Sequence, residues 1–245
     1  MSDQSNQQNP FTTRRFILAV IVVGIIAICA VIVIISNLAG VGKTAPSAGG
    51  DTPAPTSTTA APAVDPDPST CGLKDYVATG ILAVAPATKW ELVGTVAAPT
   101  DAKKNGPGVV AADGFRSCYS HTPTGALYSA ANLMALVSDT SLVKEVADKL
   151  VVPGPGRDAL LSQAGSTSTT TTRYQVAGFK IDSYSGTKAT IDLAISFSTG
   201  QILSFPIQLE WLDGDWKAQA TPTGGFTLAP AQLQNLGGYI PWAGA

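Results

Sequence analysis

The sequence carries an unbroken apolar run near its N-terminus, FILAVIVVGIIAICAVIVII at residues 16–35. A helix rises about 1.5 Å per residue, so a run of this length matches the ~30 Å hydrocarbon core of a bilayer. We therefore predict a single transmembrane helix over residues 16–36, through which the chain contacts a membrane. The rest of the sequence has to be organised around that span.

The charges beside the run predict its orientation. Arg14 and Arg15 stand directly before it, whereas only Lys43 follows it closely. The positive-inside rule then places a tail, residues 1–15, in the cytoplasm, and the C-terminal part outside the cell membrane, as in a single-pass protein. The segment TRRF also resembles a twin-arginine export signal, but the long Ile- and Val-rich run and its poor cleavage site favour an uncleaved anchor.

The segment NLAGVGKTAP contains the Gly-Lys-Thr that closes a phosphate-binding loop. Such a loop leaves a strand, wraps its backbone N–H groups around phosphate and enters a helix. Here Asn37 stands where the first glycine should be, an apolar run precedes the loop and no helical pattern follows it. We expect no nucleotide as ligand.

Residues 37–70 consist almost entirely of Ala, Pro, Thr, Ser, Gly and Asp, without an aromatic side chain. Such a segment cannot bury enough apolar surface to offset the entropy lost on ordering. We predict a disordered linker over residues 37–70.

Residues 71–245 remain as one domain, long enough to enclose a core. Its twelve Lys and Arg nearly balance its thirteen Asp and Glu. Nucleic-acid binding needs a basic excess, so this balance predicts no nucleic acid as partner.

The domain contains two cysteines, Cys71 and Cys118. An even pair in an extracytoplasmic, oxidising compartment favours a disulfide over two free thiols. We predict a bond between Cys71 and Cys118.

The segment LEWLDGDWKAQ, residues 209–219, predicts a β-hairpin, because Asp-Gly is a strong two-residue turn. With that turn, Trp211 faces Trp216 and Glu210 faces Lys217, so aromatic and charge pairs agree on one register. Alternating apolar residues before the hairpin predict further strands at about 173–183, 189–197 and 203–211. Together they form an antiparallel meander with one apolar face.

The segment HTPTGALYSAANLMALVSD predicts a helix beginning at Pro123, with small residues on the side that approaches the sheet. Shorter helices are predicted at about 142–150 and 157–163. Helices followed by a one-faced antiparallel sheet give an α+β domain. This order resembles the cystatin-like roll of nuclear-transport-factor-2-like domains, with helices packed on a curved antiparallel sheet.

A closer resemblance lies in CGL at 71–73, Trp90, GFRSCYSHTPTGALYSAAN at 114–132 and YIPW at 239–242. These motifs resemble poorly characterised actinobacterial single-span membrane proteins, some of them linked to conjugative or integrated mobile elements. Extracytoplasmic cystatin-like rolls on one membrane helix are also similar to scaffold subunits of conjugation and secretion machines. The resemblance implies a structural or interaction protein that binds other envelope proteins.

A second hypothesis is an extracytoplasmic ligand-binding module with a pocket between helix and sheet, lined by Tyr128, Tyr174 or Trp90. A pocket with converging polar groups favours the ligand hypothesis. A filled interior with an exposed apolar patch or sheet edge favours the interaction hypothesis.

Several motifs imitate catalytic sites, but none is complete. Ser141 and Lys144 fit S-x-x-K, yet no K-T-G strand follows. GPGRDA at 154–159 imitates a dinucleotide loop but lacks the preceding strand. His121 is the only histidine and cannot build a metal site alone, while Asp213 and Asp215 are turn residues. We expect no enzyme activity, no catalytic residues, no metal and no cofactor.

We predict that ATP or GTP titrated into the purified protein gives no binding signal that depends on Lys43, because the loop lacks its strand and helix. Isothermal titration calorimetry of the wild type and of Lys43→Ala measures this. A clear signal that Lys43→Ala abolishes would contradict the prediction.

Overall fold

A computed structural model describes residues 64–165, 173–226 and 228–244. Within these residues the chain has three helices, a six-stranded antiparallel sheet and two short β-hairpins. The predicted α+β class is therefore confirmed.

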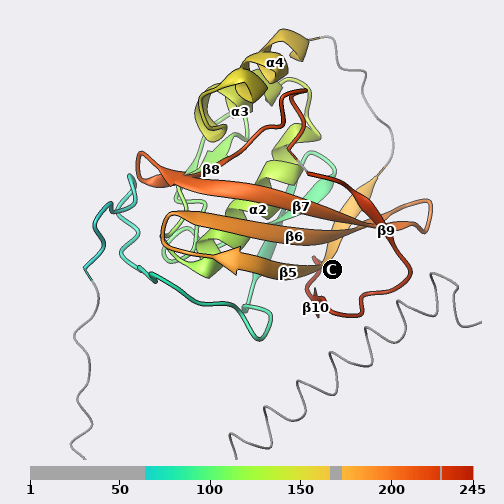
Figure 1. The fold of residues 1–245 in the computed structure, drawn as a ribbon, viewed down its shortest axis with the longest axis horizontal. Coiled ribbons are helices and arrows are strands. Elements are labelled where there is room, and N and C mark those ends of the chain that lie inside the picture. Colours follow the sequence, from blue (N-terminus) through green and yellow to red (C-terminus); the bar gives the residue numbers. More distant parts are fainter. Residues whose placement is uncertain (1–63, 166–172, 227, 245) are drawn as a thin grey trace, which may run out of the picture. The chain divides into compact units, whose positions relative to one another are not determined.

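Four consecutive strands form the predicted meander: β5 (Tyr174–Tyr184), β6 (Lys188–Phe197), β7 (Ile202–Leu212) and β8 (Asp215–Ala218). Two short strands complete the sheet. β9 (Ala231–Leu233) pairs with β7 beyond the end of β8, and β10 (Ile240–Pro241) pairs with β5. Figure 1 shows β5, β6 and β7 in front of the longest described helix.

The predicted hairpin register is confirmed. Trp211 lies opposite Trp216 and Glu210 opposite Lys217. The turn residue Asp213 has a φ of 54°, which Asp tolerates better than most residues, and a glycine follows it. Although Glu210 and Lys217 lie opposite each other, Lys217 pairs with a different carboxylate. Its Nζ lies 2.8 Å from the carboxylate of Asp213.

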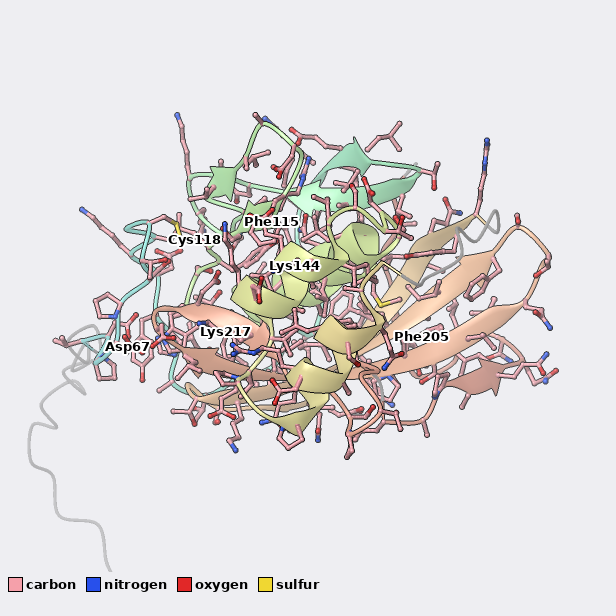
Figure 2. All side chains as sticks on the ribbon, turned by 90° about the horizontal axis from the view of Figure 1, so that it is seen from above. Asp67, Phe115, Cys118, Lys144, Phe205 and Lys217 are labelled. Atoms are coloured by element: carbon pink, nitrogen blue, oxygen red, sulfur yellow. A yellow bond between two sulfur atoms is a disulfide. The ribbon has the colours of Figure 1, made fainter. Side chains whose placement is uncertain are left out.

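The longest described helix, α2 (Pro123–Val137), lies between two β layers. It packs on the main sheet on one side and on the hairpin of β1 (Lys89–Val93) and β2 (Val96–Thr100) on the other (Figure 2). Twelve of its residues are buried. This double burial explains why its sequence is apolar and small-residue-rich around most of its circumference.

Two shorter helices, α3 (Val143–Leu150) and α4 (Pro155–Gln163), follow α2 near the predicted positions. A second small hairpin, formed by β3 (Val109–Val110) and β4 (Arg116–Ser117), precedes α2.

The C-terminal segment closes the core. Trp242 is buried, and its indole Nε1 donates to Thr88 Oγ1 at 2.8 Å. Its ring contacts those of Trp90, Tyr128 and Phe179 at centroid distances of 4.6, 5.8 and 5.6 Å. The chain end is thereby joined to α2, to β5 and to the beginning of β1.

The prediction of a membrane anchor requires correction. In the part of the chain that the structure describes, no helix is long and apolar enough to cross a membrane. The longest, α2, has 15 residues, whereas a span needs about 20. The helix predicted at 16–36 lies outside the described residues, as does the tail 1–15. The transmembrane helix, the single-pass topology and the cell-membrane localisation are not retained.

Most of the predicted linker, up to residue 63, also lies outside the described residues. Its end does not. Asp65 contacts His121, Asp67 O accepts from Trp211 Nε1 at 2.9 Å, and Thr70 N donates to Gly214 O at 3.0 Å, so residues 65–70 are hydrogen-bonded to the domain.

We predict that Gly125→Ala destabilises the domain by about 1–3 kcal/mol, although alanine is the better helix former. A β-carbon at this position would lie only 2.8 Å from the carbonyl carbon of Ser120 and would overlap its oxygen. Urea unfolding measures the change. The control is Gly225→Ala, where the nearest atom is Thr221 Oγ1 at 3.3 Å. A stabilised Gly125→Ala protein would show that α2 can shift away from Ser120.

Candidate functional site

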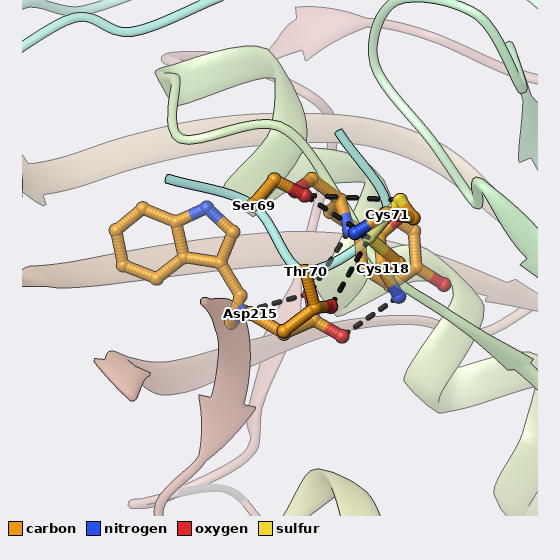
Figure 3. The surroundings of a disulfide bond; sticks show 7 residues. Ser69, Thr70, Cys71, Cys118 and Asp215 are labelled. Carbon is orange, nitrogen blue, oxygen red and sulfur yellow. Dashed lines mark hydrogen bonds between the residues drawn. A yellow bond between two sulfur atoms is a disulfide. The ribbon is translucent and has the colours of Figure 1, made fainter. Parts of the chain in front are cut away.

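The predicted disulfide between Cys71 and Cys118 is present. The two sulfur atoms are bonded, and the Cα atoms lie 6.1 Å apart. The bond joins the beginning of the domain to the segment between β4 and α2 (Figure 3). Cys71 is exposed, whereas Cys118 is only 2% exposed.

Asp215 lies buried beside this bond. Its carboxylate accepts the backbone N–H groups of Cys118 at 2.7 Å, and of Tyr119 and Trp216 at 2.9 Å each. Burial raises the pKa of Asp215 to about 6, although the three N–H donors oppose that rise. Asp215 therefore does more than shape a turn, because it fixes the backbone that carries Cys118.

His121 is enclosed by aromatic rings. It stacks on Trp211 at a centroid distance of 3.9 Å and lies 4.8 Å from the ring of Tyr76. Its Nδ1 is 2.8 Å from the Asp65 carboxylate, and its Nε2 faces the carbonyl oxygen of Gly186. Both ring nitrogens thus have oxygen partners, and His121 joins the N-terminal segment to the turn after β5.

A groove of about 990 Å³ opens beside this cluster. Three parts of the chain form its walls: the irregular segment 74–87, the loop 101–105 and residues 122–124 at the beginning of α2. Tyr76 belongs both to this lining and to the ring cluster around His121. The groove is therefore anchored on the core of the domain.

The irregular segment 74–87 is bonded to the domain through the backbone of residues 77–78. Val77 N donates to His121 O at 2.9 Å, and Gly186 N donates to Ala78 O at 2.7 Å. The hydroxyl of Tyr184 donates to Val77 O at 2.8 Å. These bonds occupy the backbone of residues 77–78 and fix where the following residues project.

Large apolar side chains are exposed along this wall. Val77, Ile81 and Val84 are 39%, 72% and 74% exposed. They are three of the eight exposed large hydrophobic residues in the described part of the chain, and they fall within eight consecutive positions. Val77 and Ile81 line the groove directly. Exposed apolar residues that cluster in this way mark an interaction surface more often than scattered ones do.

The ionic side chains in the groove balance. Lys74 and Lys104 oppose Asp75 and Asp101. One carboxylate is already used locally, since Asn105 Nδ2 donates to Asp101 Oδ2 at 2.8 Å. The groove therefore carries no net charge that would select an anionic or a cationic ligand.

The catalytic-looking motifs are not assembled. Ser141 Oγ donates to Asp139 at 2.7 Å, and Lys144 pairs with Asp148 at 2.6 Å, both on the surface. The dinucleotide-like segment forms the beginning of α4, with Pro155 in its first turn.

Among the described residues, no three His, Cys, Asp or Glu side chains come together as metal ligands.

The space between α2 and the sheet is filled. Tyr128 is fully buried there, and its hydroxyl donates to Thr88 Oγ1 at 3.0 Å, while Trp90 packs against Trp242. Tyr174 lies at the end of the sheet and lines a separate pocket of about 320 Å³ with Arg173 and Phe197. Of the three aromatic residues offered as alternatives for a pocket lining, Tyr174 lines a pocket, whereas Tyr128 and Trp90 pack against the C-terminal Trp242.

Sequence reasoning missed the groove, although a signal was present. The stretch VATGILAVAPA, residues 77–87, has apolar residues but neither the period of a helix nor that of a strand. Apolar residues without a period have no regular face to bury.

A model of a protein family described as a domain of unknown function, DUF8175, matches residues 51–241. No curated protein and no solved structure matches the chain. Of the predicted fold we retain the α+β class with its large antiparallel sheet, and the resemblance to a cystatin-like roll stays a prediction.

We predict that Asp215→Asn flattens the pH dependence of stability between pH 4 and 7. The folded-state pKa of Asp215, about 6, lies above its ordinary value of 3.8, so the folded protein binds this proton more tightly than the unfolded chain. The resulting stabilisation is complete below about pH 4 and is lost as the pH rises through 6, by about 3 kcal/mol.

Urea unfolding of the wild type and of Asp215→Asn at several pH values measures this difference. The free energy of unfolding of the wild type should fall relative to that of the variant as the pH rises. A relative increase would contradict the assigned direction.

Proposed function

The chain belongs to the DUF8175 family, and we propose, from its geometry, that its domain is a protein-interaction module. In this proposal the groove formed by residues 74–87, 101–105 and 122–124 binds an extended, uncharged and largely apolar segment of a partner protein. The observation that carries the proposal is the exposure of Val77 and Ile81 in the groove lining, with Val84 exposed three residues further along the chain.

The apolar cluster supports a protein partner because exposed side chains of this size gain free energy when a partner covers them. Burial contributes about 25 cal/mol per Å² of apolar surface. A fixed wall also lowers the entropy that binding must overcome, and residues 77–78 are fixed by their backbone bonds to His121 and Gly186.

The shape of the groove supports an extended occupant. Its long wall is irregular chain, with isolated bridges at Tyr76 and Thr79, rather than a helix or a continuous strand. An extended segment can place alternate side chains against such a wall while its backbone remains available for hydrogen bonds. The balance of two lysines and two aspartates supports an occupant without net charge.

We propose no catalytic role for the domain. The residues that imitate catalytic motifs have other partners: Ser141 bonds Asp139, Lys144 bonds Asp148, and His121 is closed in by Asp65, Gly186 and Trp211.

We predict that a photo-crosslinking amino acid at position 81 forms a discrete adduct with a partner protein in the cells that naturally make the chain. The same amino acid at position 228 is the matched control, because Leu228 is 61% exposed but lies outside the groove lining. Val77→Asp, combined with the crosslinker at position 81, should reduce the adduct at least about tenfold, since it places an unpaired charge in the apolar wall.

Thermal unfolding should be the same for the two crosslinker variants. Identical adducts from positions 81 and 228, or an adduct that Val77→Asp leaves unchanged in a folded protein, would contradict the proposal.

A further inference from the structure

The two sulfur atoms of the disulfide lie in unlike surroundings. The Cys71 residue is exposed, although its sulfur lies beside Gly108, whereas Cys118 is 2% exposed, so an external thiol reaches the bond more easily from the Cys71 side. Thiol–disulfide exchange depends on which sulfur can be reached and on how well the other sulfur leaves as a thiolate. The two sulfur atoms can therefore be compared in their accessibility and in the groups that would stabilise each as a thiolate.

Hydrogen-bond donors converge on Cys118. Cys71 N donates to Cys118 Sγ at 3.1 Å, and Thr70 Oγ1 donates to it at 3.5 Å. The hydroxyl of Ser69 lies 3.0 Å from the same sulfur (Figure 3). A disulfide sulfur is a weak acceptor, whereas a thiolate is a strong one, so these donors would stabilise Cys118 much more after the bond breaks.

The Ser69 hydroxyl has a choice of acceptor. It has one proton, and it lies 3.0 Å from Tyr119 O as well as 3.0 Å from Cys118 Sγ. The carbonyl oxygen is the better acceptor while the disulfide is intact. A charged Cys118 sulfur would reverse that preference without any movement of the backbone.

Cys71 lacks comparable donors. The carbonyl oxygen of Cys118, an acceptor, lies 3.9 Å from its sulfur, and the Ser69 hydroxyl lies 3.7 Å away. No backbone N–H is bonded to Cys71 Sγ among the contacts of the described residues. Burial of Cys118 disfavours its thiolate, and the three donors oppose that cost, so we take Cys118 as the leaving group and the more exposed Cys71 as the target.

Asp215 is the acidic group beside Cys118, and its charge opposes a thiolate. Its oxygens are, however, occupied by the N–H groups of Cys118, Tyr119 and Trp216, which offset that charge. The donors to Cys118 Sγ come from residues 69–71 and are separate from these.

We propose that Cys71–Cys118 is an exchangeable disulfide and that Cys71 is a site of modification by low-molecular-weight thiols. The thiolate of such a molecule attacks Cys71 Sγ, and its electron pair forms the new sulfur–sulfur bond. The pair of the old bond leaves on Cys118 Sγ, which becomes a thiolate bonded to Ser69, Thr70 and the N–H of Cys71. The product is a mixed disulfide on Cys71, with no net change in oxidation state.

Glutathione serves as the probe on the purified full-length chain. After brief exposure and an acid quench, free thiols are labelled with N-ethylmaleimide, and peptides are mapped without reduction. We expect glutathione on Cys71 and maleimide on Cys118, in a ratio of at least about ten to one. Equal labelling, the reverse assignment, or no mixed disulfide would overturn the proposal.

Ser69→Ala tests the role of the leaving group. Loss of a hydrogen bond to a charged group should slow formation of the mixed disulfide about tenfold. The matched control is Ser162→Ala, a surface serine whose hydroxyl donates to a backbone carbonyl in α4. Near-ultraviolet circular dichroism monitors folding, and exchange in urea should be equally fast in both variants and the wild type. An unchanged rate in folded Ser69→Ala would contradict the assigned role of its hydroxyl.

Discussion

The double burial of α2 is the constraint on which the rest of the structure depends. A helix covered by a sheet on one side and by the hairpin β1–β2 on the other must have small or apolar residues nearly all round. It must also begin at a fixed point, which Thr122 provides by accepting the N–H of Gly125. The disulfide, Asp215 and His121 all act on residues 118–121, directly before that beginning. They hold the segment from which the helix starts.

The meander and its register could be predicted because their signals are local. The turn at Asp213 fixes which residues of β7 and β8 face each other, and alternation fixes the inward face of β6. The packing of the hairpin β1–β2 on α2 could not be predicted, because it depends on contacts between separate elements and not on a local pattern. The strands β9 and β10 have three and two residues, too few to show a period.

The site was only partly visible in the sequence. The pairing of Cys71 with Cys118 was predictable from the number of cysteines in the domain. The environment of His121 was not, because its partner Asp65 lies 56 positions away within a segment of linker-like composition. The membrane span predicted from hydropathy has no counterpart among the described helices, and the groove was hidden because apolar residues in irregular chain resemble buried ones.

The position of Trp242 has a consequence for how the domain is made in the cell. Its indole bonds Thr88 across a sequence separation of 154 residues, and its ring completes the aromatic cluster on α2 and β5. Contacts of such long range are formed late, because a large loop must close before they contribute. During synthesis the core therefore stays open on this side until Trp242 has left the ribosome. A nascent chain of this protein would expose apolar α2 surface for longer than a domain closed by local contacts, and it would depend more on chaperones during that interval.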